Sequence, residues 1–231
     1  TKIHFRLFPD RLEVQHDGRV FEESASRRDV RGICGVCEST NQGDLTRIGR
    51  FGIGFKYVYA YTDRPQVHSG DEHFRVEYYV RPYAEDPRQP EADCTTLFVL
   101  PLGTQQVSAK QAFDEIAHGL DELSPRTLLF LRHIELITTE TTGCQGCRLT
   151  RSVEALLDEH VRRIHLEKCR AHEDREDWLA FDRPVKINGG NPQVRVEAAF
   201  LLAQREHDVV PVNHSPLVVF FPTEKPTGLG F

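Results

Sequence analysis

The chain has no methionine among its 231 residues and only one tryptophan. Because a complete translation product begins with methionine, we expect this chain to be an internal part of a longer protein. No stretch approaches the roughly 18 apolar residues of a membrane span. The opening Thr1-Lys2-Ile3-His4 also lacks the charged and then apolar pattern of a signal segment. We therefore expect a cytoplasmic protein with no membrane partner.

Cysteine is also scarce, and there is no excess of positive charge. Six cysteines in 231 residues exclude a disulfide scaffold and fit thiols that stay reduced. The 29 Lys and Arg residues are outnumbered by 35 Asp and Glu residues, which gives a net charge of −6. A protein surface that binds nucleic acid over a wide area needs an excess of positive charge, so the sequence carries no strong nucleic-acid signal. A hydrophobic content of 39% supports a globular core.

The first hundred residues are predicted to form mainly strands. The sequence IHFRLFPDRLEVQHDG alternates apolar and polar residues around Pro9-Asp10, which predicts a β-hairpin. Residues 20–46 are polar and irregular, with a short helix expected in SASRRDVRGICGV. Extended segments are predicted in EHFRVEYYVRPY and TTLFVLPL, separated by the loop AEDPRQPEAD.

Three glycines, Gly49, Gly52 and Gly54, lie directly before a segment with apolar residues at helical spacing. A helix N-terminus offers unpaired amide donors, and glycine lets these amides approach a phosphate without a Cβ in the way. The pattern fits neither a Rossmann turn nor a Walker loop. On spacing alone it predicts either an anion cradle or a closely packed turn. Lys56 follows in the first helical turn, where the helix dipole disfavours a cation, which favours a functional reason for it.

Three motifs follow one another in a specific order: Asp17-Gly18, then GRFGIGFK at residues 49–56, then Thr96 in TTLFVLPL. This order resembles the Bergerat ATP-binding fold of the GHKL ATPases, and the sacsin N-terminal ATPase-like and heat-shock-chaperone-like branch above all. The resemblance covers roughly residues 1–102. It implies an α+β fold: a Bergerat-type α/β sandwich, in which a mixed sheet carries helices on one face, followed by a β-rich second domain.

The resemblance also implies roles for individual residues. Asp17 would accept a hydrogen bond from the adenine amino group, and Gly18 would let the base approach closely. Thr96 would reach the adenine, usually through a water molecule. The backbone of the three glycines would meet the phosphates, with Phe51 shaping the turn. Arg50 would either neutralise phosphate charge or lie on the solvated surface. The expected cofactor-binding residues are Asp17, Gly18, Gly49, Arg50, Phe51, Gly52, Gly54 and Thr96.

Catalysis is expected to depend on residues outside this chain. In the resembled family a first helix carries a glutamate that activates water and an asparagine that holds magnesium, and both would precede Thr1. We therefore expect ATP and Mg²⁺ as cofactors, no catalytic residue within the chain, and no hydrolysis by this chain alone. Hydrolysis and lid-driven conformational change are expected in the longer parent. Adenine nucleotide, and either a protein client or a second copy, are its expected partners.

An amphipathic helical pattern in SAKQAFDEIAHGLDEL, followed by a Ser-Pro break, predicts a junction between two domains. We expect an ATP-binding domain over residues 1–124, incomplete at its N-terminus. Residues 125–231 are expected to form a β-rich transducer-like domain, incomplete at its C-terminus. The clearest strand runs there are VRVEAAFLL and PLVVFFPT.

A rival reading comes from Cys144, Cys147, His160 and His165, whose spacing satisfies C-x2-C-x12-H-x4-H. Apolar residues within 153–164 trace one face of a helix, so this spacing allows a zinc finger. The alternative function is a non-catalytic binding scaffold with a zinc-stapled second domain. Acidic residues in the would-be reading helix speak against a nucleic-acid-binding finger. We expect no metal at these residues.

Overall fold

The computed structural model describes residues 1–24, 27–35, 54–131, 133–155, 160–170, 173–185, 194–203, 208–212, 216–219 and 221–226. The chain divides into two compact units: Thr1–Glu122 with Ile137–Gly146, and Leu123–Leu136 with Cys147–Phe231. Segment Ile137–Gly146 therefore belongs with the first unit, although it lies beyond residue 124. In the described ranges, no helix combines the length and the apolar content that crossing a bilayer requires.

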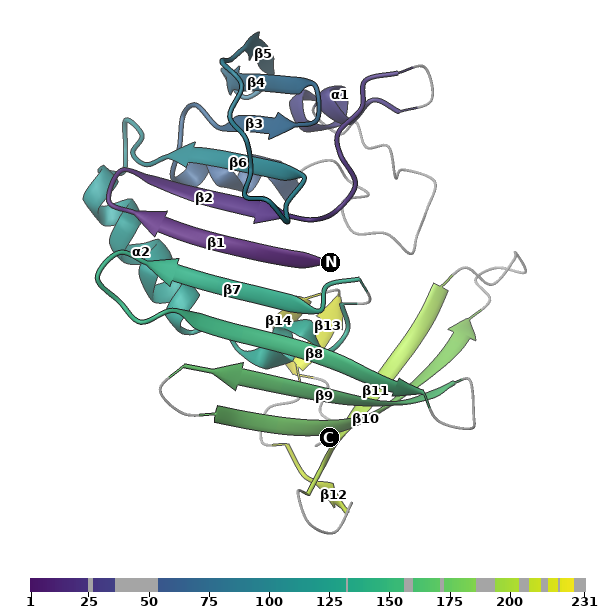
Figure 1. Ribbon diagram of the computed structural model, residues 1–231. Coiled ribbons are helices and arrows are strands. Elements are labelled where there is room, and N and C mark those ends of the chain that lie inside the picture. The colour runs from purple at the N-terminus through teal and green to yellow at the C-terminus, as the bar shows by residue number, and fades with distance from the viewer. Residues whose placement is uncertain are drawn as a thin grey trace. The chain divides into compact units, whose positions relative to one another are not determined.

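In its described residues, the first unit forms seven strands, two α-helices and one 3₁₀-helix. Figure 1 shows how these elements are arranged. In chain order they are β1 (Lys2–Phe8), β2 (Arg11–His16), α1 (Asp29–Cys34), η1 (Gly54–Ala60), β3 (Gln66–Ser69), β4 (Glu72–Glu77), β5 (Arg81–Ala84), β6 (Thr96–Pro101), α2 (Ala109–Asp121) and β7 (Leu136–Thr141). The strand order is β7-β1-β2-β6-β3-β4-β5. The predicted hairpin is confirmed as the antiparallel pair β1 and β2. The predicted amphipathic helix is confirmed as α2, whose N-cap Ser108 accepts a hydrogen bond from the Gln111 amide.

One apolar row crosses the sheet and marks the face on which the helices pack. The row is Phe5, Val14, Phe98, Val67 and Phe74, each opposite the next on the neighbouring strand. Residues two positions along a strand share a face, so a second row of Leu7, Leu12 and Leu100 lies on the same side. Residues of α2 pack on this second row, and residues of α1 and η1 pack near the first. All three helices therefore cover one face of the sheet.

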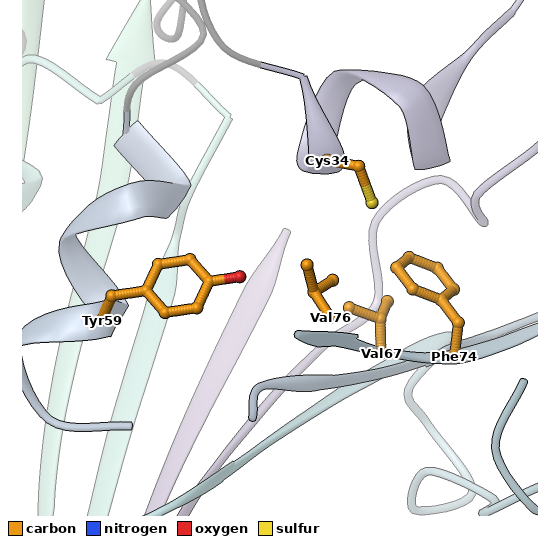
Figure 2. Close-up of a cluster of buried hydrophobic side chains, with 5 residues drawn as sticks. All are labelled: Cys34, Tyr59, Val67, Phe74 and Val76. Atoms are coloured by element: carbon orange, nitrogen blue, oxygen red, sulfur yellow. The ribbon is translucent and has the colours of Figure 1, made fainter. Parts of the chain in front are cut away.

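The core beneath α1 and η1 contains Cys34, Tyr59, Val67, Phe74 and Val76. Figure 2 shows that the strand residues point toward the helices, while the Tyr59 hydroxyl points into the cluster. This buried hydroxyl has no hydrogen-bond partner among the described residues. Burial accordingly raises the pKa of the Tyr59 phenol. The ring itself is well packed, at 4.5 Å between ring centroids from Tyr79.

The opposite face of the sheet is mostly polar, with Leu97 and Val99 as its buried apolar residues. Residues of the predicted loop AEDPRQPEAD, residues 84–93, contact this face. The Glu91 amide donates to the Gln15 side chain at 2.8 Å, and Arg88 bonds Glu13 at 3.1 Å. His68 lies on this face, fully buried, opposite His73 with 5.5 Å between ring centroids. Both ring nitrogens of His68 lack a hydrogen-bond partner in the described part of the chain.

The second unit is an antiparallel meander. Its strands are β8 (Cys147–Ala155), β9 (Val161–Cys169), β10 (Glu173–Val185), β11 (Val194–Leu202) and β12 (Val209–Val210), paired in that order. The 3₁₀-helix η2 (Pro125–Leu128) packs on β8 and β9. Its Arg126 forms a bidentate ion pair with Glu176 and lies 5.2 Å from the centre of the Trp178 ring. Two further strands, β13 (Pro216–Val219) and β14 (Phe221–Pro226), pair with each other.

The unpartnered Tyr59 hydroxyl generates a stability prediction. Replacing Tyr59 by Phe removes a buried polar group without removing the ring, so the free energy of unfolding is expected to stay constant or rise by about 1 kcal/mol. As a control, Tyr59→Leu removes the ring contacts and is expected to lower stability. Urea unfolding of the two variants measures both effects. A loss of more than about 1 kcal/mol in Tyr59→Phe would show that the hydroxyl is hydrogen-bonded.

The buried His68 predicts a dependence of stability on pH. Burial, the neighbouring His73 and Arg88 lower the pKa of His68 to about 4, while Glu85 opposes the shift. The unfolded chain binds a proton near pH 6.5 and the folded chain does not, so stability falls as pH drops from 6.5 toward 4. The full loss is expected to be at most about 3 kcal/mol.

His68→Leu should remove this slope, whereas the control His118→Gln, at an exposed site of α2, should retain it. Urea midpoints at several pH values between 4 and 7.5 provide the measurement. Parallel pH profiles for wild type and His68→Leu would contradict the assignment.

Candidate functional site

The candidate site lies where β2 ends and β6 begins. The register places Thr96, the first residue of β6, opposite both His16 of β2 and Ser69 of β3. These three residues share the face on which the helices pack. Each lies two positions along its strand from a residue of the apolar row, namely Val14, Phe98 or Val67. Thr96 and Ser69 are both buried. A polar row therefore follows the apolar row toward the end of the sheet.

Thr95, next to Thr96, joins β6 to the turn that follows β2. Its amide donates to the His16 carbonyl at 2.9 Å, and its hydroxyl donates to the Gly18 carbonyl. The sequence motifs did not indicate Thr95, because the family resemblance concerns only the second threonine of the pair. These bonds bring Asp17-Gly18 and Thr96 together, although about 80 residues separate them in the sequence.

Asp17 lies in this turn and is partly exposed. One of its carboxylate oxygens accepts a hydrogen bond from the Lys2 amide at 2.7 Å. That bond is the main reason that the pKa of Asp17 is lowered. At neutral pH the side chain is therefore an ionised group that only accepts hydrogen bonds.

Gly18 has a local structural role that the sequence analysis did not foresee. Its amide donates to His16 Nδ1 at 3.0 Å, so the ring is neutral and carries its proton on Nε2. A Cβ at position 18 would lie 2.9 Å from the same nitrogen. Burial also lowers the pKa of His16, which favours the neutral ring. Only glycine fits this turn without moving the histidine.

Of the glycine box, the structure describes Gly54, which opens η1. Among the described residues beyond its chain neighbours and the backbone of η1, no atom lies within 4 Å of the position that a Cβ at Gly54 would occupy. The helical spacing after the glycines is confirmed, as Phe55, Val58 and Tyr59 of η1 contribute to the core. The other predicted phosphate-site residues, Gly49, Arg50, Phe51 and Gly52, lie outside the described residues.

Structural contacts, rather than a function, explain why a lysine lies at position 56. Its ammonium group donates to the carbonyls of Ile33 at 2.8 Å and Cys34 at 3.2 Å, and also to the carbonyl of Tyr79. The first two carbonyls belong to the last residues of α1, where a cation is favourable. Burial lowers the pKa of Lys56. This side chain ties α1, η1 and the β4–β5 turn together.

The helix that a zinc finger would need is absent from the described parts of residues 144–165. Cys147 and Val153 lie in β8, and His165 lies in the antiparallel strand β9. Ser152, opposite His165, is five residues from Cys147. At about 3.3 Å per residue the separation along the sheet is roughly 16 Å, beyond the reach of one metal ion. The helical face predicted over 153–164 is wrong at its described residues.

His165 instead bonds Asp177 at 2.7 Å. More generally, the described part of the chain contains no group of three or more His, Cys, Asp and Glu side chains that could hold a metal ion. No ligand set for Mg²⁺ is identified there. At the candidate site, the Asp17 carboxylate offers a partly exposed hydrogen-bond acceptor, and Thr96 carries a buried hydroxyl at the start of β6.

Comparison with known proteins points to the same part of the chain. Residues 16–77 match the family model described as the Sacsin domain. The chain is also similar to the Protein NO VEIN of Arabidopsis thaliana, with 29% identity over 129 residues. That alignment covers 47% of this chain and 5% of the relative. The chain thus has a Sacsin-domain match that begins at the end of β2 and includes Asp17 and Gly18, and it spans a small fraction of the relative's length.

The contacts of Lys56 predict a loss of stability on its removal. Lys56→Met keeps the aliphatic chain but leaves three carbonyls without this donor, so unfolding is expected to be easier by about 1–3 kcal/mol. Amide exchange at Ile33 and Cys34 should accelerate in parallel. The matched control is Lys110→Met, at an exposed position of α2, with an expected change below about 0.5 kcal/mol. Equal stability of Lys56→Met and wild type would contradict a stabilising role for these three Lys56 hydrogen bonds.

Proposed function

We propose that the first unit binds the base of an adenine nucleotide at the junction of β2 and β6. The observation that carries this proposal is the bonding of His16 and Gly18 to Thr95, the residue next to Thr96, at the point where β2 pairs with the start of β6. It supports the ordered-motif resemblance in the described region, because the segments that carry two of the three motifs meet where β2 ends and β6 begins.

The chemistry of the two side chains is complementary to adenine. The amino group of adenine donates hydrogen bonds, and the ionised Asp17 carboxylate only accepts them. One Asp17 oxygen is held by the Lys2 amide, so the carboxylate is oriented before a ligand arrives. Thr96 supplies a buried hydroxyl that can donate or accept, directly or through water. Together they would recognise the edge of the base rather than its phosphates.

The arrangement of helices supports the further proposal of a Bergerat-type sandwich. Side chains of α1, η1 and α2 all pack on the sheet face that carries Thr96. A ligand at Thr96 would therefore lie between the sheet and the helical layer. In this proposal the glycine box supplies the phosphate contacts, and the β-rich second unit is a transducer-like domain.

Hydrolysis, Mg²⁺ binding and a chaperone-like action on a protein client belong, in this proposal, to the longer protein. The Sacsin-domain match supports the family assignment behind it, and the GHKL assignment rests on the ordered motifs. When bound, the nucleotide would supply a base and a phosphate chain. The residues of this chain would orient the base and shield its amino group from water.

Replacing Asp17 by Asn provides the test of this function. The Asn oxygen still accepts from the Lys2 amide, but an NH₂ group replaces the second acceptor and faces the adenine amino group. Affinity for ADP is expected to fall about ten- to a hundredfold. The control is Asp10→Asn, in the exposed β1–β2 turn, with unchanged affinity. Calorimetry on the 231-residue chain measures both. The proposal would be contradicted if wild type did not bind ADP, or if Asp17→Asn bound ADP with the same affinity as wild type.

A further inference from the structure

Ser69, at the end of β3, has a hydroxyl that joins two parts of the candidate site. Its oxygen accepts a hydrogen bond from the Phe21 amide at 3.0 Å and lies 2.5 Å from the Thr96 hydroxyl oxygen. A third, longer contact reaches the Thr95 carbonyl at 3.5 Å. Ser69 and Thr96 are almost completely buried. Bulk water therefore does not compete for these bonds.

The contact with Ser69 limits what the Thr96 hydroxyl can do. Each hydroxyl has one proton, and one of the two must donate to the other across 2.5 Å. If Ser69 donates, the Thr96 proton is left to point at a ligand acceptor. If Thr96 donates, its free lone pairs face a ligand donor. In both arrangements the position of the Thr96 oxygen is held by Ser69.

The Phe21 contact links the same serine to the segment that carries the base acceptor. Phe21 follows Asp17 by four residues, and its ring packs edge-on against Phe98 at 6.0 Å between centroids. Val20 lies against Gly70, the residue after Ser69 in the β3–β4 turn. Ser69 of β3 therefore connects the segment that follows Asp17-Gly18 to the neighbour of β6, the strand that begins with Thr96.

We propose that Ser69 is a positioning residue that sets base selectivity by holding the Thr96 hydroxyl in place. This inference rests on the adenine-nucleotide site proposed above. Ser69 does not touch the ligand; it acts through Thr96. The ligand class favoured by the site is a purine that presents an amino donor beside a ring-nitrogen acceptor. Adenine has this edge, whereas hypoxanthine presents a carbonyl oxygen beside a ring N–H.

Affinities for ADP and IDP separate selectivity from general damage. Wild type is expected to prefer ADP by about tenfold or more. Ser69→Ala should reduce this preference by about three- to tenfold, because the Thr96 hydroxyl becomes free to rotate. In a Thr96→Val background the same substitution should have no further effect on the preference, since there is no hydroxyl left to position.

The control is Thr139→Val, which removes a buried hydroxyl from β7 and should leave the preference unchanged. Ser69→Cys, close in size to serine, should behave as Ser69→Ala and serves if the alanine variant fails to fold. A variant that weakens ADP and IDP by the same factor would overturn the inference, as would independent effects of Ser69→Ala and Thr96→Val. Failure of wild type to bind ADP would instead overturn the proposed function itself.

Discussion

The placement of β6 between β2 and β3 is the constraint on which the rest of the first unit depends. It sets Thr96 opposite His16 on one side and Ser69 on the other. Because side chains alternate along a strand, a shift of one residue would turn Phe98 away from the helices and bring Leu97 toward them. The same shift would move Thr96 to the polar face. Core packing and site geometry are therefore fixed by one register.

Two adjacent rows of this sheet serve different purposes. Val14, Phe98 and Val67 bury apolar surface under the helices, and His16, Thr96 and Ser69 follow them toward the strand ends. Burying the polar row costs free energy because its groups lose their hydrogen bonds to water. Hydrogen bonds among its own members and with the chain after β2 offset this cost. Such bonds are strongest where water is excluded. This explains how buried hydroxyls are tolerated next to an apolar core.

Periodicity predicted the elements that repeat a pattern over many residues. The β1–β2 hairpin and α2 follow directly from alternation and from a helical stripe. The segment EHFRVEYYVRPY was predicted as extended, but the backbone turns at Tyr78 and Tyr79, with φ of 51° and 68°, so it forms β4 and β5. Tyrosine at positive φ gives no turn signal in a sequence. The helical face predicted over 153–164 is wrong at its described residues, because Val153 and Ile164 face each other across the paired strands β8 and β9.

The candidate site was predictable only in part. Asp17 and Thr96 were proposed from ordered motifs, and the pairing of β2 with β6 sets their two segments side by side. Ser69 and Thr95 were missed because their roles come from pairing between distant strands, which no local pattern reveals. Lys56 was noticed for its unfavourable helix position, but its carbonyl partners at Ile33 and Tyr79 come from other segments. Local rules locate elements, whereas long-range register assembles the site.

The central claim is that the turn at Asp17-Gly18 and the start of β6 receive an adenine base. Titrating the isotope-labelled chain with ADP, and following its backbone amide NMR signals, tests this most directly. We expect the largest shifts at Gly18, Ser69, Thr95 and Thr96, and no shifts in β9 and β10. Saturating ADP that leaves those four amides unshifted, or that shifts only the second unit, would contradict it.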